Sequence, residues 1–213
     1  MDQTLIVLLF ASLAGEMQDD QEPISIDVAA AITRAQAGDR QAVAELYQAH
    51  VHQIYRYIAV RVSDPADVED LTADVFVRMV EGLSTYQMTG APFEAWLYRI
   101  AASRVVDYYR AKSRGGAVAL SDIMAAPGET PEQEMIETQG FDLLRAALHA
   151  LPEVYQLLLI LRFVERKSHE ETARILGRSL SSVKSMQHRA LTRLAEQMGL
   201  DQKARHYLRG EDG

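Results

Sequence analysis

Apolar residues recur every three or four positions along most of this chain, a spacing that gives a helix one apolar face. The pattern predicts helices at residues 26–37, 40–62, 65–81, 93–113, 130–150, 153–164, 168–176 and 179–194. No segment shows the alternation of apolar and polar positions that is typical of a half-buried strand. We therefore expect an all-α fold.

Capping residues mark the ends of the N-terminal helices. Gly38 should close the first helix and Asp39 should cap the second. Asp64 and Pro65 should stop the second helix and start the third, because aspartate caps a helix and proline is tolerated in its first turn. The residues expected to turn into the core from these two helices are Val43, Leu46, Tyr47, Val51, Ile54, Tyr55, Ile58 and Val62, then Val68, Leu71, Val75, Phe76, Met79 and Val80.

Residues 168–194 are predicted to form two helices joined by a tight turn. Ser168 and Glu171 have the spacing of a capping box, in which the hydroxyl and the carboxylate each accept a hydrogen bond from a backbone amide of the first turn. Gly177 suits the left-handed conformation that ends many helices, and Ser179 can cap the second helix. The apolar face of that second helix should consist of Val183, Met186, Ala190 and Leu194.

Every charged residue from position 178 to position 193 is positive, and short polar side chains stand among these cations. The cations are Arg178, Lys184, Arg189 and Arg193, and the polar residues are Ser181, Ser182, Ser185, Gln187 and His188. Cations suit phosphates, polar tips suit base edges, and a helix fits the major groove. The pattern favours a DNA-binding helix-turn-helix, although an antiparallel helix pair with a solvated basic face would show the same pattern.

The helix predicted at 93–113 combines cations with aromatic rings. Its cations are Arg99, Arg104, Arg110, Lys112 and, just beyond it, Arg114. Between residues 99 and 114 the only acid is Asp107. Cations can hold phosphates, and aromatic rings offer stacking surface for unpaired bases. The rings are Tyr86, Trp96, Tyr98, Tyr108 and Tyr109. We expect Trp96 to be mostly core, and the more exposed candidates to be Arg99, Ser103, Arg104, Tyr108 and Arg110.

Three carboxylates gather on one face of the helix predicted at 65–81. Asp67, Asp70 and Asp74 follow one another at i, i+3 and i+7, so they lie away from the apolar face of that helix. Clustered carboxylates repel one another unless water or a basic surface meets them. The cluster is therefore either an ordinary solvated surface or a contact for a basic partner.

Composition limits the classes of function. The chain has 213 residues and a formal net charge of −8, so any contact with DNA should use local basic patches. It contains no cysteine, which excludes disulfides and thiolate metal sites. His50 and His52 lie two positions apart on a predicted helix and point in different directions. We therefore expect no metal site and no cofactor.

Composition also divides the chain. Residues 115–144 contain no lysine or arginine but accumulate acids. We expect two helical domains joined by a flexible acidic linker, with these boundaries: 1–24 for an N-terminal extension, 25–114 for the first domain, 115–129 for the linker, 130–199 for the second domain and 200–213 for a tail. The apolar run at 5–13 is too short to span a bilayer, and Met17 is an alternative start, so no function is assigned to this run.

Several segments, in this order, resemble bacterial sigma factors of the extracytoplasmic-function (ECF) group of the sigma-70 family. They are Asp67–Phe76 (DVEDLTADVF), Phe93–Ala101 (FEAWLYRIA) continued by Asp107 and Arg110, Leu151–Glu153 (LPE), and Ser168–Ser185, which begins SHEE. The resemblance implies two helical domains, called region 2 and region 4. Sigma factors are not enzymes; the resemblance implies a cytoplasmic protein that binds core RNA polymerase and directs promoter-specific initiation.

The resemblance also implies roles for particular residues. Those implied to bind the clamp of core polymerase are Asp67, Asp70, Leu71, Asp74 and Phe76. Those implied to contact and melt the −10 element are Arg99, Ser103, Arg104, Tyr108, Arg110, Lys112 and Arg114. Those implied to bind the −35 element are Arg178, Ser181, Ser182, Lys184, Ser185, Gln187, His188, Arg189 and Arg193. A further implied partner is an anti-sigma factor, and no direct membrane insertion is expected.

A few positions depart from the family pattern. Ser103 stands where asparagine is common, which leaves the base preference at −10 open. Met186 and Gln187 stand where a cation and then an apolar residue are common, so we expect Met186 to turn inward and Gln187 outward, where it can contact adenine. Arg178 stands in the turn where relatives favour an aliphatic residue, and we expect it to add a phosphate contact. Two alternatives stay open: an autonomous helix-turn-helix regulator that binds duplex DNA without polymerase, and an adaptor that mimics a sigma factor.

Overall fold

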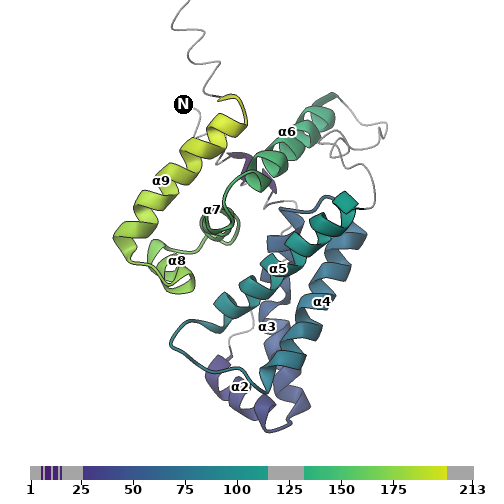
Figure 1. Cartoon of the computed structure of the whole chain (residues 1–213), viewed down its shortest axis with the longest axis vertical. Helices are drawn as coiled ribbons and strands as arrows, with labels where there is room; N and C mark the ends of the chain where they lie inside the picture. The colour runs from purple at the N-terminus through teal and green to yellow at the C-terminus, as the bar shows by residue number, and fades with distance from the viewer. Residues whose placement is uncertain are drawn as a thin grey trace, which may run out of the picture. The chain divides into compact units, whose positions relative to one another are not determined.

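The computed structural model describes residues 6, 8–10, 12, 13, 15, 26–114 and 132–200. Its elements are α2 (Val28–Gln36), α3 (Arg40–Ala59), α4 (Pro65–Leu83), α5 (Phe93–Arg114), α6 (Glu132–His149), α7 (Glu153–Leu159), η2 (Ile160–Val164), α8 (His169–Leu176) and α9 (Leu180–Gln197) (Figure 1). Every regular element in this part of the chain is helical, which confirms the all-α prediction. None of these helices is long and apolar enough to cross a membrane.

The chain divides into two compact units. One contains α2 to α5, and the other contains α6, α7, η2, α9 and residues 169–173 of α8, together with the residues described before position 16. We call them the first and the second domain. The predicted linker at 115–129, the helix start at 130–131 and the tail from 201 onward lie outside the described residues.

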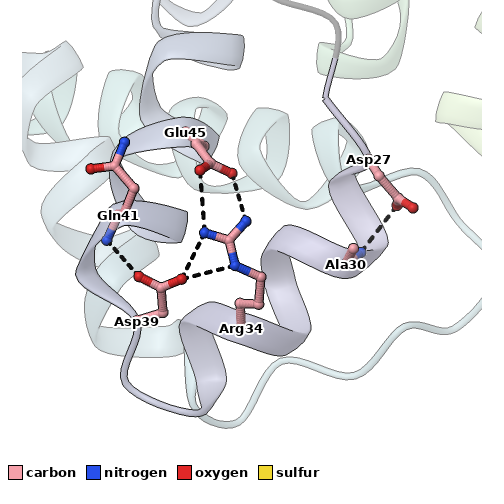
Figure 2. Close-up of polar contacts among 6 residues, drawn as sticks. All are labelled: Asp27, Ala30, Arg34, Asp39, Gln41 and Glu45. Atoms are coloured by element: carbon pink, nitrogen blue, oxygen red, sulfur yellow. Dashed lines mark hydrogen bonds and ion pairs between the residues drawn. The ribbon is translucent and has the colours of Figure 1, made fainter.

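Polar contacts fix the corner between α2 and α3 (Figure 2). Asp27 and Asp39 cap the two helices by accepting backbone amides, and Gly38 between them has a φ of +95°. Arg34 donates to Asp39 at 2.8 Å and to both carboxylate oxygens of Glu45 at 3.0 and 3.2 Å. The hydrogen bond from Arg34 lowers the pKa of Asp39 below its usual range. The expected turn is therefore confirmed and carries an ion-pair network.

The core of the first domain receives apolar side chains from all four helices. Its buried residues include Ile32, Leu46, Ile54, Ile58, Val68, Val75, Met79, Leu97, Ala101 and Val105. The prediction was wrong for two residues expected in this core: Tyr47 is 45% exposed and Val80 is 52% exposed. The buried face of α4 continues from Met79 to Leu83, and Val80 lies beyond its edge. Thr72 takes a buried place on that face because its hydroxyl donates to the carbonyl of Val68 at 2.7 Å.

The turn that joins α8 to α9 has the geometry expected from its sequence. Ser168 accepts the amide of Glu171 at 3.1 Å, and the Glu171 carboxylate accepts the amide of Ser168 at 2.7 Å, which confirms the capping box. Gly177 has a φ of +61°, and Ser179 caps α9 by accepting the amide of Ser182 at 3.3 Å. The helix-turn-helix prediction is confirmed at the level of backbone and caps.

The segment before this turn differs from the prediction in its second half. Pro152 separates α6 from α7, as expected. The helix predicted as one run at 153–164 changes into a π-helical turn at 160–164, where the amide of Glu165 donates to the carbonyl of Ile160 at 3.0 Å. Arg166 then adopts a φ of +53° and redirects the chain toward α8. Apolar periodicity alone does not distinguish these two kinds of helical turn.

Candidate DNA and polymerase interfaces

Helix α9 buries one face and presents a polar outer surface. Val183, Met186, Ala190 and Leu194 are buried, as expected. The residues that line one open hollow on α9 are Ser181, Ser182, Lys184, Ser185, His188 and Arg189. All of them belong to the set expected to bind the −35 element. The hollow therefore combines two cations for phosphates with short polar side chains for base edges.

Gln187 departs from the prediction. Met186 is turned inward, as expected, but Gln187 is half-buried rather than outward. Its side-chain oxygen accepts a hydrogen bond from Arg162 of η2 at 3.1 Å. Residue 187 lies four positions after Val183 and three before Ala190, so it borders the buried face of the helix. The adenine contact expected of Gln187 therefore requires this side chain to leave Arg162.

The two outermost cations of the predicted set do not line the hollow. Arg178 is exposed in the turn before α9, close in sequence to the capping residue Ser179. Arg193 is exposed one turn after Arg189 on α9, and its guanidinium carbon lies 5.4 Å from the centroid of the Tyr155 ring. This cation–π contact gives Arg193 a partner inside the domain.

In the first domain, side chains expected to bind DNA contact side chains expected to bind polymerase. Tyr108 of α5 donates to Asp67 of α4 at 2.7 Å. Arg104 of α5 donates to Asp74 of α4 at 3.1 Å and also to Asp107. Two of the three clustered acids are therefore met by side chains of this chain's own α5: a tyrosine hydroxyl at Asp67 and a guanidinium at Asp74.

Tyr108 and Arg104 are less exposed than expected. Both side chains are half-buried, because the neighbouring acids draw them onto α4. Burial, together with the hydrogen bond to Asp67, raises the pKa of Tyr108. Lys112 donates to the Tyr108 hydroxyl at 3.0 Å, and its ammonium lies 5.4 Å from the centroid of that ring.

The remaining residues expected to bind the −10 element lie along the outer side of α5. Arg99, Ser103, Arg110 and Lys112 are exposed. Among the described residues, Arg110 forms a 3.8 Å ion pair with Asp107. Arg114 ends the helix, and its side chain is outside the described part of the structure. This surface keeps several cations available for phosphates.

A cavity of about 440 Å³ lies where α4 ends and α5 begins. Its lining residues are Gly82, Thr85, Tyr86, Gln87, Thr89, Ala91, Pro92, Trp96 and Arg99. The rings of Tyr86 and Trp96 have centroids 4.8 Å apart, and a Cβ on Gly82 would lie 3.0 Å from the Trp96 ring. Gly82 thus lets the indole approach α4 closely, so that Trp96 is half-buried rather than fully core.

Tyr86 was expected to offer stacking surface, but the polar loop residues that line this cavity were not predicted from the sequence. Thr85, Gln87 and Thr89 supply hydroxyl and amide groups beside the aromatic rings. Their only sequence signal is a polar loop that directly precedes an aromatic helix start. Tyr98, by contrast, was expected to offer stacking surface and is fully buried, with its ring centroid 5.2 Å from that of Tyr57.

An exposed apolar surface lies on α3 and α4. It consists of Tyr47, Val77 and Val80, and the two valines are 54% and 52% exposed. Phe76 is buried under this surface, with its ring centroid 4.8 Å from that of Tyr47. Phe76 was expected to touch polymerase directly, but its burial leaves Tyr47 as the aromatic ring on the outside. Among the clustered acids, Asp70 is exposed.

Two segments of the chain match known family models. Residues 46–115 match Sigma-70 region 2, and residues 141–194 match Sigma-70, region 4. The chain is also 37% identical over 189 residues to the ECF RNA polymerase sigma factor ShbA of Streptomyces griseus subsp. griseus, a match that covers 84% of this chain and 97% of ShbA. The chain belongs to the ECF group of the sigma-70 family.

Other similarities of this ECF factor cover different shares of its relatives. It is 33% identical over 166 residues to the ECF sigma factor BldN of Streptomyces coelicolor, which covers 77% of this chain but only 63% of BldN. Its fold is similar to that of CnrH, solved in complex with the cytosolic domain of CnrY, with a TM-score of 0.55 and 22% identity over 80% of this chain and 96% of that one. Region 2 thus includes α4 and α5, and region 4 includes α7, α8 and most of α9.

Proposed function

We propose that this ECF sigma factor directs core RNA polymerase to promoters by dividing the work between its two domains. Region 4 binds the −35 element, and region 2 melts the −10 element. The observation that carries this proposal is the hollow on α9, because two cations and four hydrogen-bonding side chains converge on one helix face. The protein is not an enzyme in this account, and it acts in the cytoplasm.

In region 4, Lys184 and Arg189 bind phosphates and fix the position of α9 in the major groove. Ser181, Ser185 and His188 reach base edges, where hydroxyl and imidazole groups can donate and accept hydrogen bonds. Gln187 acts mainly through Arg162, whose guanidinium it orients between η2 and α9. The outer cations Arg178 and Arg193 add phosphate contacts at the two ends.

In region 2, the cavity at the start of α5 receives one unpaired base of the −10 element. Tyr86 and Trp96 provide aromatic surface, and base–aromatic stacking contributes about 1–3 kcal/mol per base. Thr85, Gln87 and Thr89 offer hydrogen bonds to the edge of that base. Arg99 at the rim, with Ser103 and Arg110 further along α5, follows the backbone of the strand.

Core polymerase contacts the surface formed by Tyr47, Val77 and Val80 and the acid Asp70 beside it. Exposed apolar groups rimmed by charge are typical of protein interfaces. The basic clamp of polymerase meets Asp70, and it competes with Tyr108 and Arg104 for the other two acids. An anti-sigma factor that covers these surfaces would keep the protein inactive.

The experiment that tests the division of work measures promoter binding by the reconstituted holoenzyme. Arg189→Ala should weaken binding about tenfold and lower the slope of affinity against salt by about one, because one phosphate contact is lost. Arg40→Ala removes an exposed cation of α3 and should leave both quantities unchanged. Equal effects of the two substitutions would contradict the assignment of α9 to DNA.

A further inference from the structure

The apolar run near the N-terminus has one buried and one exposed side. Ile6, Phe10 and Leu13 are fully buried, and they follow one another at i, i+4 and i+7. Leu8 is 61% exposed, and Ser12 and Gly15 are exposed as well. The described residues of this run are helical. The run therefore behaves as an amphipathic helix whose apolar side is covered by protein.

The covering surface belongs to the second domain. The ring of Phe10 stacks on the ring of Phe163 in η2, with centroids 5.8 Å apart and an angle of 21° between the planes. A Cβ on Gly140 of α6 would lie 3.3 Å from Cδ2 of Leu9, so the absence of a side chain at Gly140 leaves room for Leu9. The described residues of the run, 6, 8–10, 12, 13 and 15, belong to the same compact unit as this domain.

The N-terminal run packs on a domain that is distant from it in sequence. The N-terminal run precedes α2 in sequence, yet it packs with region 4, which follows α5. A segment that is tied to its site by the rest of the chain binds at a high effective concentration even when its own contacts are few. The caps of α8 and α9 are formed within those helices themselves, by Ser168 with Glu171 and by Ser179 with Ser182. Departure of the N-terminal run therefore leaves these caps in place.

We propose that the second domain carries a binding groove for an amphipathic helix, lined by Phe163 and Gly140, and that the N-terminal run with Ile6, Phe10 and Leu13 is its resident occupant. The groove recognises three apolar side chains at i, i+4 and i+7, with an aromatic ring in the middle position against Phe163. When the run leaves, the groove is open to any helix with the same spacing. The run is thus an internal competitor for partners of region 4.

A fluorescent peptide with the sequence of residues 1–16 tests the groove on the full-length chain. Phe10→Asp places a charge against Phe163 and should vacate the groove, so the peptide should bind this variant at least about tenfold more tightly than it binds the wild type. Leu8→Asp is the matched control, because Leu8 is exposed; this variant should exclude the peptide as the wild type does. Equal binding to all three chains, or no binding to Phe10→Asp, overturns the proposal.

Hydrogen exchange and light scattering complete the test. In Phe10→Asp, amides at 160–164 should exchange faster than in the wild type and should be protected again by saturating wild-type peptide, while those of α9 stay unchanged. Adding Phe163→Asp to the Phe10→Asp chain should abolish the binding of the peptide. If light scattering instead showed a wild-type dimer, and dilution of that dimer removed the protection of amides 160–164, the run would dock on a second copy of the chain. Docking within one chain would then be overturned. None of these readouts involves polymerase or a promoter, so they are independent of the proposed function.

Discussion

The hydroxyl of Tyr108 donates a hydrogen bond to Asp67 across 2.7 Å, and this contact joins two helices with different expected tasks. Tyr108 stands on the helix assigned to promoter melting, and Asp67 stands on the helix assigned to polymerase. Arg104 and Asp74 form a second such contact at 3.1 Å. In free region 2, side chains from both surfaces thus hold one another, and binding of polymerase to the acids would release groups that DNA can use.

Tyr108→Phe should lower the free energy of unfolding of region 2 by about 1 kcal/mol at neutral pH, because the Asp67 carboxylate loses one half-buried hydrogen bond. The effect should also depend on pH. Since the pKa of Tyr108 is raised in the folded state, its stabilising contribution is present below the ordinary tyrosine value of about 10 and is lost as the pH rises above it.

Urea unfolding followed by Trp96 fluorescence at pH 7 and again above pH 10 measures both effects. Wild type should lose more stability over this range than Tyr108→Phe. If Tyr108→Phe lost more stability than the wild type between these two pH values, or if both lost the same amount, the tyrosine would not be held as a neutral donor.

Arg104→Ala should destabilise region 2 by about 1–2 kcal/mol, since it removes a half-buried cation that pairs with Asp74 and Asp107. Arg110→Ala should cost less than about 0.5 kcal/mol, because that side chain is 67% exposed and its ion pair with Asp107 is 3.8 Å long. Thermal unfolding of the two variants gives the comparison. If Arg110→Ala destabilised region 2 as much as Arg104→Ala, the contact of Arg104 with Asp74 between α5 and α4 would not contribute measurably to the free energy of unfolding.

How much the sequence predicts depends on the range of the forces involved. Caps such as Asp39, Asp64 and Ser168 are determined by neighbours two or three residues away, and all three form as expected. The burial of residues at the edge of an apolar face, such as Val80 and Gln187, was predicted wrongly. The helical period of 3.6 does not determine whether such an edge residue faces the core or the solvent; packing against other elements does.

Contacts between distant parts of the chain are invisible to local patterns. The partners in the Tyr108–Asp67 hydrogen bond are 41 residues apart. The cavity beside Trp96 likewise combines the end of one helix, a loop and the start of the next. The sequence could place an aromatic helix and a polar loop in order, but only packing brings them around one hollow.

Tyr86→Ala should reduce formation of the open promoter complex about tenfold, because the cavity loses one of its two stacking surfaces for an unpaired base. Met88→Ala is the control: this residue is exposed in the same loop and does not line the cavity. Permanganate reactivity of unpaired thymines in the holoenzyme–promoter complex is the measurement. Unchanged melting with Tyr86→Ala would exclude the cavity as the site for a flipped base.

Met186→Ala should destabilise region 4 by about 2–3 kcal/mol, because it empties part of the core beneath α9. Gln187→Ala should cost about 1 kcal/mol through the lost hydrogen bond with Arg162 and should reduce −35 affinity only modestly. Chemical unfolding and holoenzyme binding to a −35 duplex separate the two quantities. A large and adenine-specific loss of affinity with Gln187→Ala would restore the direct contact expected from sequence.

The most direct test of the account is run-off transcription by purified core polymerase on a promoter library, with and without this protein. Initiation should depend on the protein and should select templates that share one −35 and one −10 element. The double substitution Lys184→Ala with Arg189→Ala should lower this initiation at least tenfold. Tight binding of the protein alone to duplex DNA, with initiation unchanged, would contradict the account and identify an autonomous regulator instead.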